Sequence, residues 1–396
     1  MSSKPALEEE LNGPNDGPTK DIQDPVVWMS DGNIIVGVLD ETNNERHMFK
    51  CHRGILSSRL PALRDMFEAD GVGGSAGASA SEKYQGLPFV RFYDNPKHVR
   101  LLLRVIYNPS TLPYKWWLRT TMDEIEGLMR LTRKYEAEDL YQHCVTIFQN
   151  AWPSTLDRWD LRETEMLRIF DEPQYDEEDY DVWKGRAQVI GHHQPDPGAA
   201  ILLLDEYDLP GNGASAFYAL HTTYVPTYTV SSASPQQLFP NSLPCTANKL
   251  SARLLLQFIH GREFIRHLGS ELICRTLPGL LLNLRTCDTF DECQLSIVGM
   301  WQQRVVSLTE EGSAVFDDPL RTLKNMCGFI EKRGSNDTCV MCKNNMVECL
   351  TEARRYIWDG MTIYFGIEDN GNGRERSLYE LSYNLRTRMK ARGLIL

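Results

Sequence analysis

Sequence patterns typical of β-strands lie before residue 93 of this chain, and patterns typical of helices fill most of the remaining residues. Three short runs are typical of β-strands: residues 33–39, which are rich in β-branched residues, and the shorter runs 48–51 and 87–92. The turn-forming cluster at residues 40–44 joins the first two runs and predicts a β-hairpin. A doubly wound parallel sheet would need strands that alternate with helices throughout. Because the strands come early and the helices late, the sequence predicts an α+β fold followed by a mainly α-helical region.

Apolar residues at helical spacing mark the helices of this first domain. One stripe consists of Leu56, Leu60, Leu63 and Phe67. Pro61 falls inside that stripe, so we expect two short helices. A second stripe consists of Val99, Leu102, Leu103 and Ile106. The last helix ends at Trp152-Pro153, and we therefore place the first domain at residues 21–152.

The remaining segments divide into expected loops and expected helices. Residues 1–24 lack apolar periodicity and are expected to be disordered, and we assign residues 1–20 as a tail. Within the helical region, 153–396, the run at 171–181 holds seven carboxylates and predicts an exposed loop. Residues 222–246 are rich in Thr, Ser, Tyr and Pro and predict a long loop. Helices are expected in residues 202–219, with a break at 209–211, and at 252–259, 320–330 and 346–358.

Charge and cysteine usage restrict the classes of partner and compartment. The formal net charge is −12, which disfavours non-specific binding to nucleic acid or to anionic membranes. No apolar run approaches the roughly 18 residues of a membrane span. The ten cysteines are dispersed, and the first residues have no apolar signal-peptide core. We therefore expect reduced thiols and a cytoplasmic or nuclear location.

The order of features between residues 31 and 144 resembles the BTB (also called POZ) domain. The hairpin ends in Phe49-Lys50-Cys51-His52-Arg53, where the family has Phe-x-x-His-Arg/Lys. A Leu-rich segment ending in Met66-Phe67 comes next, as in the family. Later matches are Val90-Arg91-Phe92, Asp94, Leu102 to Tyr107, Lys134-Tyr135 and Leu140. The resemblance implies the BTB fold and a role in protein–protein interaction.

A finer resemblance extends over most of the chain. Its segments are similar to those of the large BTB-protein families of mushroom-forming fungi. They are Trp28 to Ile35, Leu202 to Pro210, Ala216 to Leu220, Ile259 to Glu263 and Tyr364 to Ile367. This similarity implies a fold more than a function.

The resemblance also implies interaction residues. In BTB dimers, an Asp of the first strand and the Arg or Lys after the His form a charged pocket at the interface. Arg53 matches the second position, whereas either Asp31 or Asn33 aligns with the first. If Asn33 is the match, the acid is missing and dimerisation loses support.

Two further groups are candidate partner contacts. Met122 and Glu124 fit the hydrophobic-x-Glu motif that some BTB proteins use to bind cullin ubiquitin ligases. Trp116 and Trp117 lie just before them, and adjacent tryptophans near a domain rim can contact a partner. A buried position for one of the two is the competing interpretation.

Four cysteines, Cys327, Cys339, Cys342 and Cys349, lie close together in the C-terminal region. The CxxC spacing of Cys339 and Cys342 can supply two ligands of a tetrahedral zinc site. Cys327 and Cys349 sit on apolar helical stretches, where cysteine packs as a small hydrophobe. Zinc binding, a redox-active pair and simple packing therefore all stay open, and we assign no metal and no cofactor.

No catalytic constellation is visible in the sequence, so we expect a non-enzymatic protein. The leading hypothesis is an interaction scaffold whose BTB domain binds a protein partner or a second copy of itself. The alternatives are a substrate adaptor for a cullin-type ubiquitin ligase and a zinc-binding or redox-active protein acting through the C-terminal cysteines.

Overall fold

The computed structural model describes most of the chain between Lys20 and Ile395. The described residues are 20–69, 83–118, 120–170, 195–207, 209, 213–223, 249–281, 287, 290–310, 316–332, 338–367 and 378–395. The predicted acidic loop at 171–181 lies outside them, as do residues 1–19 of the predicted tail and all but the first two residues of the predicted loop at 222–246. The described part divides into two compact units. The first unit takes residues up to 115 and 123–147, and the second takes 116–122 and 148 onwards.

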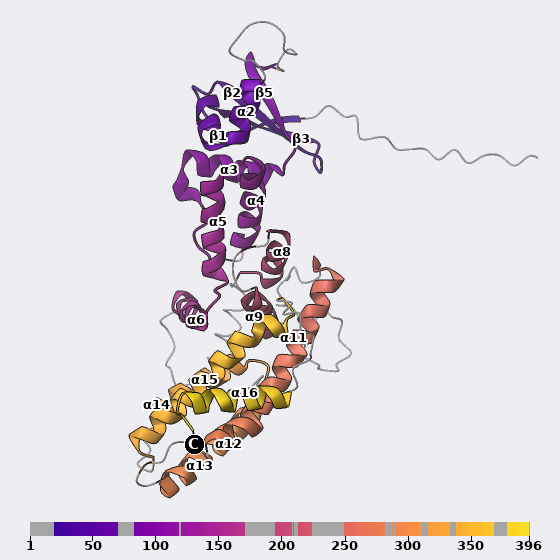
Figure 1. Ribbon diagram of the computed structural model, residues 1–396. Helices are drawn as coiled ribbons and strands as arrows, with labels where there is room; N and C mark the ends of the chain where they lie inside the picture. Colours follow the sequence, from indigo (N-terminus) through magenta and orange to yellow (C-terminus); the bar gives the residue numbers. More distant parts are fainter. Residues whose placement is uncertain are drawn as a thin grey trace, which may run out of the picture. The chain divides into compact units, whose positions relative to one another are not determined.

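A five-stranded sheet forms the first part of the first unit (Figure 1). Its strands lie in the order β1-β3-β2-β5-β4. The bounds are β1 Lys20–Trp28, β2 Ile34–Asp40, β3 Glu45–Cys51, β4 Lys83–Tyr84 and β5 Leu87–Phe92. The pairing of β2 with β3 is antiparallel and runs from Ile34 opposite Cys51 to Asp40 opposite Glu45, which confirms the predicted hairpin. β5 lies parallel to β2 on the other side.

Strand β1 corrects the expectation of disorder for residues 20–24, the described part of the expected disordered segment 1–24. It pairs parallel to β3 from Lys20 onwards, with a register shift between Gln23 and Trp28. The buried carboxylate of Asp24 accounts for that irregularity, because it accepts hydrogen bonds from the backbone N–H groups of Val26 and Val27 at 2.9 and 2.8 Å. Asp24 also pairs with Arg100, which lies on the helix Pro96–Tyr107.

Of the helices in this part of the chain, the first two lie between β3 and β4, and the others follow β5. Their bounds are α1 Arg53–Arg59, α2 Pro61–Ala69, α3 Pro96–Tyr107, η1 Pro109–Thr111, α4 Thr120–Lys134 and α5 Glu138–Ala151. Pro61 separates α1 from α2 as predicted, and both apolar stripes of the sequence are buried. Helix α5 ends at Ala151, just before Trp152-Pro153. The fold class is thus confirmed, whereas the domain bounds 21–152 stay a prediction.

The described second unit is helical. Its elements are α6 Leu156–Phe170, α8 Pro197–Tyr207, α9 Ala214–Thr223, α11 Ala252–Glu271, η3 Leu272–Thr276, α12 Leu277–Leu281, α13 Phe290–Glu310, α14 Pro319–Lys332, α15 Val340–Tyr364 and α16 Leu378–Ala391. Helix α15 contacts α9, α11, α12, α14 and α16 and so forms the centre of this unit (Figure 1). None of the helices in the described ranges is long and apolar enough to cross a membrane.

Ion pairs join α15 to helices that are distant in sequence. Arg354 donates two hydrogen bonds, at 2.9 and 2.6 Å, to the carboxylate of Asp160 on α6. Glu352 is buried and pairs with Arg388 and Arg392 at the end of the chain. Because a buried carboxylate loses its hydration, these two partners offset part of the cost of burying Glu352.

Candidate functional site

The predicted interface residues meet at the start of helix α1. We call Asp31, Asn33, His52 and Arg53 the charged corner. The side-chain Oδ1 of Asn33 accepts a hydrogen bond from the backbone N–H of Arg53 at 2.8 Å. The backbone N–H of Asn33 donates to the carbonyl of Cys51 at 2.9 Å. Asn33 therefore satisfies one of the first N–H groups of α1 and holds the hairpin against that helix.

Asp31 keeps a carboxylate that is open to solvent. Its side chain is 83% exposed, and its Oδ1 lies 3.1 Å from Nε2 of His52. A hydrogen bond from its own backbone N–H lowers the pKa of the Asp31 carboxyl, and the hydrogen bond with His52 lowers it further. Asp31 rather than Asn33 is thus the acidic group that this corner presents.

His52 has a structural role at the end of the β2–β3 hairpin. The hydroxyl of Tyr107 accepts a hydrogen bond from the backbone N–H of His52 at 2.8 Å and lies 3.1 Å from its Nδ1. Burial raises the pKa of Tyr107 to about 12, so this hydroxyl stays protonated. The imidazole therefore bridges α3 and the turn that carries Asp31.

The guanidinium of Arg53 is held in place by α2. Its Nη2 donates to the carbonyl of Phe67 at 2.9 Å, and its Cζ lies 5.3 Å from the centre of the Phe67 ring. Arg53 is half-buried. One corner of the first unit therefore combines an exposed carboxylate with an oriented guanidinium.

The two adjacent tryptophans occupy different environments. Trp116 is buried and Trp117 is half-buried, with their rings edge to face at 5.7 Å. The Cζ of Arg162 lies 5.9 Å from the centre of the Trp116 ring and also faces the rings of Trp152 and Trp159, at 5.2 and 4.8 Å. Burial lowers the pKa of Arg162 to about 10. Trp116 thus serves packing inside the second unit and is unsuited to partner contact.

The residues of the hydrophobic-x-Glu motif are also covered. Met122 has no exposed surface, and its Sδ accepts a hydrogen bond from Nε1 of Trp152 at 3.3 Å. Glu124 is half-buried, and its desolvation raises the pKa of its carboxyl despite the nearby Arg104. A partner could reach Met122 only after a rearrangement of its surroundings.

The four cysteines singled out in the sequence do not form one group. The Sγ of Cys327 faces the carbonyl of Val347 at 3.9 Å, and Cys349 is buried in the middle of α15. Burial raises the pKa of Cys349 to about 12, so both thiols act as small packing groups. Cys339 and Cys342 lie elsewhere, at the start of α15.

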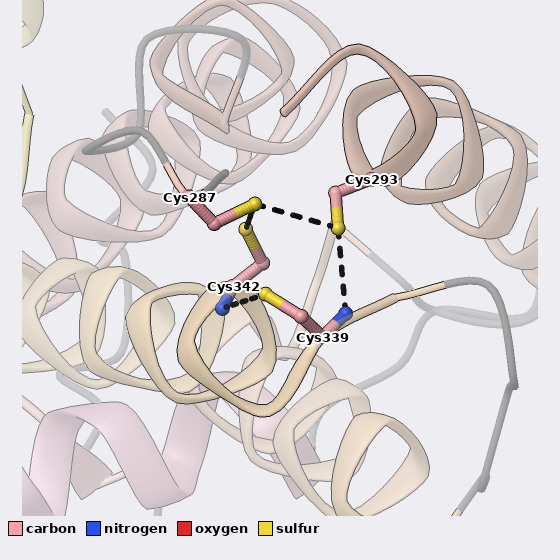
Figure 2. A group of neighbouring side chains, drawn as sticks. All are labelled: Cys287, Cys293, Cys339 and Cys342. Carbon is pink, nitrogen blue, oxygen red and sulfur yellow. Dashed lines mark hydrogen bonds between the residues drawn. The ribbon is translucent and has the colours of Figure 1, made fainter. Parts of the chain in front are cut away.

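Cys339 and Cys342 instead meet two cysteines that the sequence patterns did not single out. Their partners are Cys287, which lies before α13, and Cys293, near the start of α13 (Figure 2). The four Sγ atoms all lie within 4.8 Å of one another. Burial and the neighbouring thiols raise the pKa of the Cys342 thiol. The C-x₅-C spacing of Cys287 and Cys293 was the available signal, but 46 residues separate Cys293 from Cys339.

Comparison with known proteins identifies the first domain. A family model of the BTB/POZ domain matches residues 38–151. These residues form a BTB domain. The match begins in β2 and ends with α5, and it covers less than a third of the 396 residues. A search of curated proteins and a search of solved structures found no match. The BTB domain is a protein-interaction module, which confirms the coarse functional expectation.

Proposed function

We propose that this protein is a non-enzymatic interaction scaffold whose BTB domain pairs with a second copy of itself. The match of residues 38–151 to the BTB/POZ family carries the proposal, because that domain is an interaction module. The helical unit then presents a second surface for another protein. No catalytic step enters this role.

The charged corner supports self-pairing. A two-fold symmetric interface joins the same patch on both copies, so the patch must complement itself. The corner meets this condition because it carries the exposed carboxylate of Asp31 beside the oriented guanidinium of Arg53. In the proposed dimer, Asp31 of one copy faces Arg53 of the other.

Sedimentation of the full chain tests this arrangement. We expect the wild-type chain to form dimers and Asp31→Arg to weaken them at least about tenfold, since like charges then face each other. The double variant Asp31→Arg, Arg53→Asp restores opposite charges and should recover dimers. Glu41→Lys, in the turn at the other end of the β2–β3 hairpin, is the matched control. A wild-type chain that stays monomeric at high concentration would refute self-pairing.

The cullin-adaptor hypothesis adds a separate claim at Met122 and Glu124. The burial of Met122 favours the scaffold, because the motif needs its apolar residue at the surface. A pull-down with a purified cullin N-terminal region distinguishes the two functions. We expect no binding, and binding that Met122→Ala and Glu124→Ala abolish would replace the scaffold by the adaptor.

Two finer assignments accompany the proposal. We place the chain among the BTB proteins of the type expanded in mushroom-forming fungi, on the similar segments that are spread over most of the chain. We also place it in the cytoplasm or nucleus, on the dispersed cysteines and acidic charge. Microscopy of a fluorescently tagged chain tests the location, and a secreted product would contradict it.

A further inference from the structure

Four cysteine side chains of the helical unit point toward one common centre (Figure 2). Sγ of Cys287 lies 3.7 Å from Sγ of Cys293 and 3.5 Å from Sγ of Cys342. The sulfur of Cys339 completes the group, in which every pair lies within 4.8 Å. Three separate segments deliver these sulfurs: the one before α13, the first part of α13, and the start of α15. Packing alone does not require four polarisable groups from three segments to converge.

The spacing of the sulfurs fits one tetrahedral metal ion. A zinc ion binds four thiolates at about 2.3 Å, which places the sulfurs about 3.8 Å apart. Sγ of Cys287 lies 3.7 Å from Sγ of Cys293 and 3.5 Å from Sγ of Cys342, which is close to this sulfur–sulfur distance. An iron–sulfur cluster holds its cysteines around several iron atoms, so it spreads them over a larger volume. The compact group therefore favours a single ion.

Backbone amides around the group suit thiolates. The N–H of Cys342 donates to Sγ of Cys339 at 3.4 Å, and the N–H of Cys339 donates to Sγ of Cys293 at 3.3 Å. Cys339 is the N-cap of α15, and Cys342 lies in the first turn of that helix. The positive end of the helix dipole stabilises negative charge at this place.

The surroundings indicate a structural site. Cys293 and Cys342 are buried, and Cys287 and Cys339 are half-buried. All four tetrahedral positions are taken by sulfur, which leaves none for water or substrate. Beside the group, the hydroxyl of Thr338 donates to Ser296 at 2.7 Å and makes a second link between α13 and the start of α15.

We propose that Cys287, Cys293, Cys339 and Cys342 bind one structural Zn²⁺ ion. Four thiols lose their protons to solvent, four zinc–sulfur bonds form, and no electron is transferred. The resulting centre carries a charge of −2, which the adjacent amides and helix end stabilise. The ion joins α13 to α15, the helix at the centre of the unit. Zinc loss should therefore loosen the helical unit.

Metal content of the purified full chain is the first test. We expect about one zinc per chain by elemental analysis. Cys293→Ser and Cys287→Ser should each lower the bound zinc at least about fivefold, since a three-sulfur site is incomplete. Cys327→Ser is the matched control, because Cys327 is a half-buried cysteine outside the group, and it should keep its zinc. Equal zinc content in all four proteins would place the metal elsewhere and overturn the proposal.

A spectroscopic test needs no variant that could fail to fold. The wild-type chain, stripped of metal under reducing conditions, is titrated with Co²⁺. Four thiolates around Co²⁺ give intense visible absorption that is diagnostic of tetrahedral geometry, and Zn²⁺ should then displace it at about one equivalent. No such absorption with folded, reduced protein would refute the site. A disulfide among these cysteines in freshly isolated protein would assign them to redox chemistry instead.

Discussion

Helix α3 of the BTB domain and helix α11 of the helical unit bury their apolar residues in different ways. In α3, Val99, Leu102, Leu103 and Ile106 form one stripe, and every member is buried. Helix α11 has apolar residues on more than one side. Leu254, Phe258, Ile265 and Leu268 are buried, whereas Leu256 and Ile259 are 56% and 50% exposed. A helix with two apolar sides leaves the choice of its buried face to its neighbours.

Phe365 is the neighbour that decides the face of α11. It follows α15 directly, has no exposed surface, and stacks on Phe217 at 5.1 Å. Its ring lies against Gly261 so closely that a Cβ there would clash with it. Helix α11 can approach this ring only on the side where residue 261 lacks a side chain. The buried face of α3 therefore follows from the spacing of its apolar residues. The buried face of α11 is set by the close approach of Phe365 to Gly261.

Adjacent residues on α11 give the largest expected difference. Phe258→Ala should lower the free energy of unfolding by about 3–4 kcal/mol, because it empties a buried position. Ile259→Ala, one residue further on, should change it by less than about 0.5 kcal/mol. Urea unfolding of the full chain, followed by circular dichroism, measures both. Similar losses for the two variants would show that α11 buries both sides.

The stripe of α3 should be nearly as sensitive. Leu102→Ala should cost about 3 kcal/mol, because Leu102 has no exposed surface in the BTB domain. Lys97→Ala, at an exposed position of the same helix, is the control and should cost less than about 0.5 kcal/mol. The same unfolding measurement applies, and a loss below about 1 kcal/mol for Leu102→Ala would contradict the one-sided burial of α3.

The close approach at Gly261 has a smaller expected effect. Gly261→Ala should destabilise the chain by about 1–3 kcal/mol through overpacking against Phe365. Gly328→Ala on α14, where an added Cβ meets nothing within 4 Å, should instead stabilise by about 0.5–1 kcal/mol. Thermal unfolding shows whether each variant raises or lowers the melting temperature. A neutral or stabilising Gly261→Ala would mean that Phe365 does not select the face.

The smallest expected effect concerns how the stability contributed by the Asp24–Arg100 pair, which joins β1 to α3, depends on pH. Burial by itself raises the pKa of Asp24, but the N–H groups of Val27 and Val26 and the guanidinium of Arg100 outweigh it, so the folded pKa is lowered. This pair therefore stabilises fully above the unfolded pKa, about 3.9, and the stabilisation is lost as pH falls through the folded value. One carboxyl contributes at most about 1.4 kcal/mol per pH unit.

Asp24→Asn should flatten the fall in melting temperature on acidification. Glu41→Gln, an exposed turn residue, is the control for loss of one surface carboxylate. Melting curves between about pH 2 and 6 cover the range in which a carboxyl titrates. An unchanged slope in Asp24→Asn would show that the Asp24–Arg100 pair does not link α3 to β1.

The two candidate sites differ as the two helices do: local sequence predicted the members of one, and only the packing of distant segments identified the members of the other. Asp31 and Asn33 lie just before the β2–β3 hairpin, and His52 and Arg53 follow it directly, so a short ordered pattern sufficed to bring them together. The sequence also marked Cys339 and Cys342 by their CxxC spacing. It grouped them with Cys327 and Cys349, which are nearer in sequence, and left out Cys287 and Cys293. Only the packing of α13 against the start of α15 identified the actual neighbours.

The sequence by itself determined the α+β order, the hairpin, the helices of the BTB domain and the buried stripe of α3. These features depend on contacts between residues a few positions apart, which periodicity and turn residues encode. Strand β1 was not predicted from the sequence, because Asp24-Pro25 interrupts its pattern and its hydrogen bonds come from its partner β3. The tertiary structure alone decided the buried face of α11, the covering of Met122 and Trp116, and the membership of the cysteine group. Each of these depends on which distant segment approaches through space, and no local pattern records that approach.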